Sequence, residues 1–243
     1  MLIDPLITQL GELRLRGMAR ALERQQGLPD VQSLPFEDRL GLLIQHEVVE
    51  RQSSRLAQRL RWAKLGQAAC IEDLDARTPR GLAKGQLTQL AQGDWLDQRL
   101  NVLITGPTGV GKSYIACALA HQACRQDRSV RYFRMSRLTE DLLRAGATQK
   151  RSAFFKQLAR VDLLVFDDFG LSPISDEIKR DLLEIIDDRF DRRSTLITSQ
   201  LPVDHWHRYL DDPTLADAIL DRLVHNAHRL ELQGESMRRK KAA

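Results

Sequence analysis

The residues from Gly106 to Ser113 have the types and the spacing needed to hold a chain of phosphates. They read Gly-Pro-Thr-Gly-Val-Gly-Lys-Ser, a glycine and four residues followed by Gly-Lys-Ser. Because glycine has no Cβ, such a loop can adopt positive φ angles and turn its N–H groups toward phosphate oxygens. Lys112 would place a positive charge beside the β- and γ-phosphates, and the Ser113 hydroxyl would be a ligand of Mg2+. The alternative is a glycine-rich turn with a chance lysine.

The flanking elements are those that this phosphate-binding motif needs. Val102 to Thr105 is a short apolar run, typical of a buried strand, and residues 114–120 are typical of a helix. The N-terminus of that helix would direct its positive dipole end at the bound phosphate. The sequence therefore predicts a Mg2+-dependent nucleotide site formed by Gly106, Pro107, Thr108, Gly109, Val110, Gly111, Lys112, Ser113 and Tyr114.

Two adjacent carboxylates follow a second apolar strand and would complete the site. Residues 163–166 read Leu-Leu-Val-Phe and lead into Asp167 and Asp168. Because ligands of parallel sheets bind at the carboxyl ends of strands, Asp167 would hold Mg2+ opposite Ser113. Asp168 would orient or deprotonate the attacking water. Two alternatives stay open: the pair could only cap the strand, or Asp168 could be the base for an acceptor hydroxyl in a small-molecule kinase.

Alternating strands and helices in the second part of the chain must position these residues. We expect strands at 102–105, 130–133, 163–166, 195–198 and 229–232, and helices at 113–126, 136–144, 149–160, 176–192 and 214–225. This order predicts an α/β fold in which a parallel sheet is sandwiched by helices. The earlier residues read as helical, with segments at 6–25, 36–64 and 79–92. We therefore predict a small all-helical domain, residues 1–93, followed by a nucleotide-binding domain, residues 94–243.

Composition and charge describe an ordinary soluble protein. The 243 residues are 29% charged and 42% hydrophobic, with a net charge of +4. No apolar run approaches the roughly 20 residues that cross a bilayer, and the N-terminus lacks the features of a signal peptide. These observations predict a cytoplasmic protein with no membrane partner. The cysteines lack a metal-binding spacing, so Cys117 and Cys124 are expected to be small core residues.

Two basic stretches are candidates for contact with nucleic-acid phosphates. The first places positive charges nearly four residues apart along one helix face, at Arg51, Arg55, Arg59, Arg61 and Lys64. The second contains Arg144, Lys150, Arg151 and Lys156. Neither has a base-reading motif, so contacts would be mainly to phosphate and strongly salt-dependent. A solvated helix face is the alternative for the first stretch, and Trp62 beside it could stack on a base or pack in a core.

Taken together, these segments resemble the IstB-type transposition helper ATPases, relatives of the DnaC helicase loaders and of the DnaA-like initiator branch of AAA+ proteins. The resemblance extends over nearly the whole chain. It is carried by the phosphate loop, by Asp-Asp-Phe-Gly at 167–170, by Leu-Ile-Thr-Ser-Gln-Leu-Pro at 196–202 and by Leu-Ala-Asp-Ala-Ile-Leu-Asp-Arg-Leu at 215–223. It implies a P-loop AAA+ domain with little or no C-terminal lid.

The resemblance implies a further catalytic residue after the fourth strand. Gln200 matches the polar residue that contacts the γ-phosphate and helps to place the water, although Thr198 or Ser199 could present a hydroxyl instead. Many AAA+ enzymes have glutamate where Asp168 stands. The shorter side chain changes how closely a water can be held, which points to slow or partner-stimulated turnover.

An arginine for the neighbouring subunit is also implied. Arg222 matches the arginine that AAA+ subunits insert into a neighbour's site, where it neutralises charge as the terminal phosphate departs. The alternative is an ion pair with Asp217 or Asp221 on its own helix. Ser236 and Arg238 resemble the serine and arginine of the family's C-terminal motif, which implies that Arg238 is a second phosphate-sensing arginine. An exposed basic tail is the alternative for Arg238.

The function implied by the resemblance is that of an ATP-dependent, DNA-binding ATPase that assists an IstA-type transposase, with ATP and Mg2+ as cofactors. ATP would lie between the phosphate loop of one subunit and Arg222 of the next, so the protein would self-associate into an ATP-dependent oligomer on double-stranded DNA. Three alternatives stay open: a DnaC-like replicative helicase loader, the small-molecule kinase named above, and a nucleotide-gated scaffold that hydrolyses no appreciable ATP.

Overall fold

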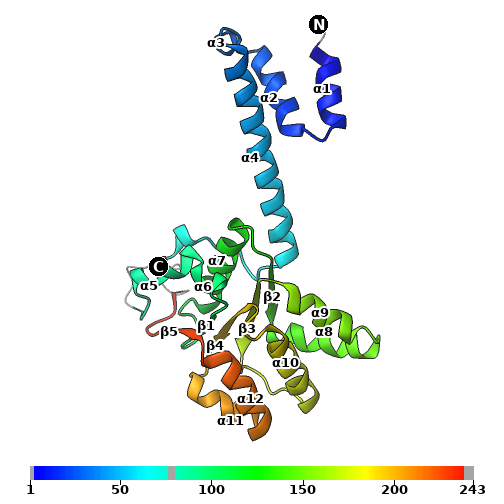
Figure 1. Ribbon diagram of the computed structural model, residues 1–243. Helices are drawn as coiled ribbons and strands as arrows, with labels where there is room; N and C mark the ends of the chain where they lie inside the picture. Colours follow the sequence, from blue (N-terminus) through cyan, green and yellow to red (C-terminus); the bar gives the residue numbers. More distant parts are fainter. Residues whose placement is uncertain (1–2, 76–79, 238–243) are drawn as a thin grey trace. The chain divides into compact units, whose positions relative to one another are not determined.

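The computed structural model describes residues 3–75 and 80–237, and the chain divides into two compact units, Met1–Gln58 and Arg59–Ala243 (Figure 1). The sequence pattern predicts a domain boundary after residue 93, whereas in the structure residues 59–93 belong to the second unit. The reason is that the helices η1 (Ile71–Asp73) and α5 (Lys84–Gln92) both contact α7 (Lys112–Arg125). Within the described ranges, no helix combines the length and the apolar character that a bilayer-spanning segment requires.

The first unit contains the helices α1 (Ile3–Glu12), α2 (Arg16–Gln26), α3 (Pro29–Gln32) and the first part of α4 (Phe36–Ala63). The apolar spacing predicts one helical segment at 6–25, but the chain leaves the helix after Glu12. Arg14 has a φ of 61°, a left-handed conformation that does not continue a helix. The prediction of a single helix there is therefore wrong.

Helices α2 and α4 meet at Gly17 and Glu47. The backbone N–H groups of Gly17 and Met18 donate to the Glu47 carboxylate at 2.7 and 3.2 Å. These donors lie in the first turn of α2, where a helix leaves its N–H groups unpaired and favours a negative charge. A Cβ on Gly17 would lie 2.6 Å from the Glu47 Cα, so this approach requires glycine. The helical spacing of Leu40, Leu43, Ile44, Val48 and Leu56 predicts a buried stripe on α4, and this prediction is wrong at Ile44 and Val48, which are exposed.

The second unit is built on a five-stranded parallel sheet, as the sequence predicts. The strands in chain order are β1 (Asn101–Thr105), β2 (Val130–Arg134), β3 (Leu163–Phe169), β4 (Ser194–Ser199) and β5 (Ala227–Glu231). Their order across the sheet is β2-β3-β4-β1-β5. The carboxyl ends of β1, β3 and β4 therefore lie side by side, which brings the phosphate loop next to the segments that follow β3 and β4.

Helices cover both faces of the sheet in Figure 1. Besides η1, α5, α7 and the end of α4, the helices that the structure describes in this unit are α6 (Asp94–Asp97), α8 (Met135–Ala147), α9 (Arg151–Arg160), α10 (Asp176–Arg189), η2 (Val203–His205), α11 (Trp206–Leu210) and α12 (Pro213–Val224). Helix α7 contacts β1, β2, β3 and β4, while α8 contacts β2 and β3 and α12 contacts β1. The sandwich predicted from the sequence is confirmed.

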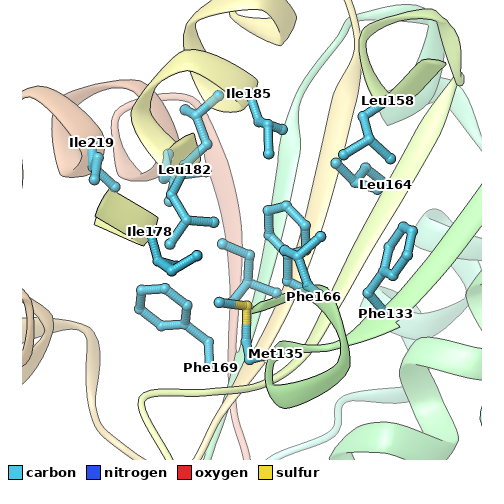
Figure 2. Close-up of a cluster of buried hydrophobic side chains, with 14 of the residues drawn as sticks. Phe133, Met135, Leu158, Leu164, Phe166, Phe169, Ile178, Leu182, Ile185 and Ile219 are labelled. Atoms are coloured by element: carbon cyan, nitrogen blue, oxygen red, sulfur yellow. The ribbon is translucent and has the colours of Figure 1, made fainter. Parts of the chain in front are cut away.

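One large apolar cluster packs one face of the sheet against helices (Figure 2). Alternate strand residues such as Leu103, Leu164 and Phe166 enter this cluster together with residues of α8, α9, α10, α11 and α12. Their neighbours Val102 and Val165 are equally buried, and strand alternation directs them to the other face, toward α7. Because both faces are covered, the three central strands β1, β3 and β4 carry nearly continuous buried runs, whereas the edge strand β5 has one buried residue, Leu230. The expected core positions of Cys117 and Cys124 are confirmed, since both are buried free thiols.

Candidate nucleotide-binding site

A hollow beside the phosphate loop brings together most of the residues predicted from the sequence. It is lined by Gln67, Asp73, Leu74, Asp75, Arg80, Thr108, Gly109, Gly111, Lys112, Ser113, Tyr114, Asp168, Gln200 and Met237. The loop residue Val110 is buried beneath it, and Asp167 is buried behind Ser113. The loop, the second carboxylate and Gln200 therefore face one space, and Arg222 lies elsewhere.

The loop has the conformation that its glycines permit. Gly106, Gly109 and Gly111 have φ angles of 143°, 88° and 97°, values that residues with a Cβ rarely adopt. Lys112 begins α7, so the helix N-terminus opens on the hollow. The Lys112 ammonium donates to the carbonyls of Gly106 and Pro107 at 2.7 and 2.8 Å. Burial lowers the pKa of Lys112, and the charges of the nearby aspartates oppose this shift.

Asp167 is fully buried and accepts hydrogen bonds from three hydroxyl groups. Ser113 Oγ and Thr198 Oγ1 donate to Oδ1 at 2.8 and 2.5 Å, and Tyr132 Oη donates to Oδ2 at 2.6 Å. The Asp167 and Ser113 oxygens are hard donors of the kind that Mg2+ prefers, so these two residues fit a magnesium ion. Such an ion, when bound together with a triphosphate, would neutralise charge on its β- and γ-phosphates.

Asp168 is held in an unusual backbone conformation at the edge of the hollow. Its φ is 62°, and the register between β3 and β4 is irregular between Phe166 and Phe169. The Asp168 N–H donates to Thr198 Oγ1 at 3.1 Å, which fixes the turn. Left-handed conformations of this kind cost about 1–3 kcal/mol and gather at functional sites. The irregularity separates the two carboxylates, so that one is buried and the other faces the hollow.

Among the polar residues that end β4, Gln200 is the one that reaches the hollow. Thr108 Oγ1 donates to Gln200 Oε1 at 2.8 Å, which connects the phosphate loop to the segment after β4. The Thr198 hydroxyl is used by Asp167, and Ser199 Oγ donates to the Phe169 carbonyl at 2.7 Å. Of the three residues left open by the sequence, the geometry favours Gln200 as the ligand contact.

Arg222 lies at the opposite end of the sheet. Asn101, the first residue of β1, donates from Nδ2 to the Arg222 and Leu223 carbonyls at 3.1 and 3.2 Å, whereas the phosphate loop follows the last residue of β1. A strand of this length spans roughly 16 Å, so Arg222 cannot reach the hollow of its own chain. Its Nε pairs with Asp187 on α10 at 2.6 Å, rather than with Asp217 or Asp221 of its own helix, and its Nη1 donates to the Ala218 carbonyl at 2.8 Å.

Several residues of the hollow were missed by the sequence analysis. Gln67, Asp73, Leu74, Asp75 and Arg80 come from a segment without a recognisable motif, and its contact with the loop depends on the tertiary fold. The chain after β5 also reaches the loop, because the Met237 N–H donates to the Gly109 carbonyl at 2.9 Å. A Cβ on Gly109 would lie 2.3 Å from Ser236 Oγ. The role predicted for Arg238 falls outside the described residues.

Comparison with known proteins decides the family. The sequence model of the family described as "IstB-like ATP binding protein" matches residues 8–243. This chain belongs to the IstB-like ATP-binding proteins. A Sinorhizobium fredii relative named as an insertion sequence ATP-binding protein is 48% identical over 239 residues, 98% of each chain. A Pseudomonas fluorescens relative, named for the insertion sequence IS1162, is 50% identical over 203 residues, 83% of this chain and 88% of the relative.

Solved structures show that this IstB-like chain has the fold of DnaC and DnaA AAA+ domains. A crystal structure of DnaI has a TM-score of 0.58 at 20% identity, covering 68% of this chain and 90% of DnaI. The DnaC helicase loader has a TM-score of 0.55 at 17% identity, covering 68% of this chain and 96% of DnaC. At these identities the likeness concerns the fold. The family resemblance and the fold predicted from the sequence are confirmed.

Proposed function

We propose that this IstB-like protein is a DNA-binding ATPase that assists an IstA-type transposase of an insertion sequence. The observation that carries the ATPase part is the convergence of Lys112, Ser113, Asp168 and Gln200 on one hollow. The insertion-sequence names of relatives that match along nearly their whole length support the transposition part.

In this proposal each chemical task has its own residue. The loop N–H groups and Lys112 bind the β- and γ-phosphates, where positive charge stabilises the transferring phosphoryl group. Asp168 accepts a proton from the attacking water, or orients it, from its position on the open side of the hollow. Gln200, held by Thr108, directs the same water. The buried Asp167 would hold Mg2+ together with Ser113.

ATP binding and assembly are tested together with Lys112→Ala. The wild-type protein should form larger particles with ATP and duplex DNA in analytical ultracentrifugation, and this variant should not, because the phosphate-binding cation is lost. Lys179→Ala is a matched control, since both lysines are buried, at 7% and 6% exposure, and Lys179 pairs with Asp176 outside the hollow. If the wild-type protein bound DNA with the same affinity in the presence and absence of nucleotide, the proposal would be contradicted.

The basic stretches predicted to contact DNA are partly neutralised by acidic neighbours. Among the described residues, four of the nine predicted cations form ion pairs: Arg51 with Glu47, Arg59 with Asp127, Arg144 with Asp141 and Arg151 with Glu177. In each pair a carboxylate already balances the positive charge, so less of that charge is available to a phosphate. Trp62, the aromatic residue of the first stretch, has the Arg131 guanidinium over its ring at 5.1 Å. These stretches therefore offer less free charge than the sequence suggests.

A denser set of cations surrounds a second hollow at the amino ends of the strands. This basic hollow is lined by the exposed residues Arg99, Lys156, Arg160, Arg192 and Arg193, with Asp188 beside them. Arg99 precedes β1, Arg160 precedes β3, and Arg192 and Arg193 precede β4. Arg193 forms an ion pair with Asp162 at 3.6 Å, while the other four basic side chains around the hollow form a surface suited to the phosphates of a duplex. We include this surface in the proposal as the site of DNA contact.

Salt dependence distinguishes the basic hollow from the paired arginines. Combining Lys156→Ala with Arg160→Ala should reduce the slope of log affinity against log salt by about 1.8, if both contact phosphates. The matched control combines Arg137→Ala with Arg144→Ala, because these exposed arginines pair with Glu140 and Asp141. Its slope should be close to that of the wild type. Equal slopes in both double variants would remove the basic hollow from the proposal.

The remaining alternatives differ in partner and product. A helicase loader would share the fold, and capture of purified replicative helicase in place of purified transposase would favour it. A small-molecule kinase would release little phosphate without an acceptor hydroxyl. A nucleotide-gated scaffold would bind ATP but show no conversion to ADP in a single-turnover measurement. DNA-stimulated phosphate release together with transposase capture is the combination that the proposal requires.

A further inference from the structure

Arg80 is a buried cation that reaches the phosphate loop from the segment before β1. Its side chain is shielded, at 5% exposure, and lines the nucleotide-binding hollow. Arg80 Nη1 donates to the Val110 carbonyl at 2.9 Å, and Nη2 donates to the Asp75 carbonyl at 2.8 Å. One guanidinium therefore connects the phosphate loop to a part of the chain thirty residues earlier.

The guanidinium lies directly at the start of α7. Gly111 has a φ of 97° and is followed by Lys112, the first residue of that helix. A Cβ added to Gly111 would lie 2.7 Å from Arg80 Nη1, so the arginine occupies the space that a side chain at this position would need. Arg80 and Lys112 thus bring two cations to a helix N-terminus that already favours anions.

The hydrogen bonds of Arg80 leave part of its bonding capacity unused. A guanidinium has five N–H donors, and the two bonds described above go to neutral carbonyls. Its Nε is buried and has no hydrogen-bond partner among the described residues. Burial also lowers the pKa of Arg80, with the charge of Asp75 opposing the shift. Since burying a cation is costly unless it is well paired, an anion in the hollow would add to the favourable charge of Asp75 and use the remaining N–H groups of Arg80.

We propose that Arg80 is a second cationic contact for the phosphates of the bound nucleotide. The proposal rests on the nucleotide site described above and adds a residue that lies outside the phosphate loop. Its carbonyl bonds hold the planar guanidinium beside Gly111, and its remaining N–H groups bind phosphate oxygens. Arginine suits this task because its donors are fixed in one plane and its charge persists when buried.

Titration calorimetry with adenosine, AMP, ADP and ATP tests this role on the full chain. In Arg80→Gln the affinity for ATP and ADP should fall about tenfold or more, the size expected for a lost charge-assisted hydrogen bond. The affinity for adenosine should not change, because it carries no phosphate. Arg80→Lys should show a smaller, still phosphate-dependent loss, since it keeps the charge and loses the planar fork. An equal loss for adenosine and ATP, or no loss, would overturn the proposal.

Arg131→Gln is the matched control. Arg131 is also buried, at 9% exposure, and donates to the Trp62 carbonyl at 2.6 Å. Within the part of the chain that the structure describes, its Nε has no hydrogen-bond partner and it does not line the hollow. Its replacement should leave all nucleotide affinities unchanged. A wild-type protein that binds no ATP would refute the nucleotide site itself, whereas normal binding by Arg80→Gln would refute only the role of Arg80. If Arg80→Gln does not fold, the contrast between ATP and adenosine in Arg80→Lys decides.

Discussion

At the scale of single residues, two adjacent aspartates have been given different environments. Asp167 is buried and saturated by hydroxyl donors, while the left-handed turn at Asp168 exposes the second carboxylate to the nucleotide-binding hollow. The Asp167 carboxylate and the Ser113 hydroxyl that donates to it bring hard oxygen atoms together, which suits a metal ligand. A carboxylate facing the reacting atoms can exchange a proton. The backbone irregularity in β3 is therefore what separates the two tasks.

Asp168→Asn should abolish turnover while keeping the fold. Asparagine tolerates the left-handed conformation nearly as well as aspartate, so the turn should survive, but the amide cannot accept a proton. We expect the rate of ATP hydrolysis to fall by about 100-fold or more, with ATP-bound, DNA-associated particles accumulating. Steady-state phosphate release and ultracentrifugation measure the two effects. Unchanged turnover would remove Asp168 from the catalytic role.

The control for this prediction makes the same substitution in the same backbone conformation. Asp211 has a φ of 47° at the end of α11, is exposed and does not line the nucleotide-binding hollow. Asp211→Asn should hydrolyse ATP at the wild-type rate. Slower hydrolysis in both variants would point to a general effect on left-handed turns.

Sequence patterns anticipate site residues when one local segment determines the geometry. The phosphate loop is such a segment, because its glycines, lysine and serine act within eight residues. Arg80 and Tyr132 were not predicted, although each contacts a predicted residue. Their contacts, to Val110 and Asp167, join segments thirty or more residues apart. The Tyr132 contact depends on β2 and β3 being neighbours in the sheet, and the Arg80 contact depends on where its segment packs. No local motif encodes either arrangement.

At the scale of elements, the start of β3 is tied to the residue before β2. Ser129 N and Oγ donate to Asp162 Oδ2 at 2.9 and 2.6 Å, and the Asp162 N–H donates back to Ser129 Oγ at 3.0 Å. The Leu163 N–H donates to the Ser129 carbonyl at 3.0 Å and begins the ladder. Burial would raise the pKa of Asp162, but these hydrogen bonds and the nearby arginines outweigh it and lower the pKa. The ionised carboxylate therefore stabilises this strand pair.

Ser129→Ala should destabilise the protein at neutral pH and much less in acid. A lowered pKa means that the stabilisation is complete above the ordinary value of 3.8 and is lost as the pH falls through the folded-state pKa. At pH 7 we expect a loss of about 1–2 kcal/mol in the free energy of unfolding, because a charge-assisted hydrogen bond disappears. Urea unfolding at pH 7 and near pH 3 measures the difference. Ser152→Ala, an exposed serine on α9, is the control.

The elements themselves could be predicted to different degrees. The strands predicted from the sequence lie within a few residues of the observed ones, most clearly for β1 and β3, where burial on both faces makes an apolar run continuous. The break between α1 and α2 was missed, since Arg14 is not a typical left-handed residue. The segment at 59–93 has helical composition, and its packing on α7 could not be inferred from periodicity. Local composition thus predicts where helices and strands lie along the chain but not which of them pack against each other.

At the scale of the whole sheet, the two ends carry different ligands in our proposal. The nucleotide lies at the carboxyl ends of β1, β3 and β4, while Arg222 and the basic hollow lie at the amino ends. A parallel sheet makes this separation unavoidable, because all strands end on the same side. If Arg222 acts on ATP, the ATP must belong to another chain. Association of subunits and nucleotide occupancy would then be linked.

Arg222→Ala should therefore hydrolyse little ATP alone, and hydrolysis should return when it is mixed with a second variant. We expect a fall in DNA-stimulated ATP hydrolysis of about 1000-fold, as for other arginines that act on a neighbour's phosphate. Asp187→Asn removes the carboxylate that pairs with Arg222 and keeps the arginine, so it controls for the lost ion pair and should remain active. Mixing Arg222→Ala with Lys112→Ala should restore hydrolysis, because an intact loop in one subunit can then face an intact arginine in the next. If the mixture is as inactive as its components, a site shared between subunits is excluded. If Arg222→Ala alone is active, the arginine has only a structural role as the partner of Asp187.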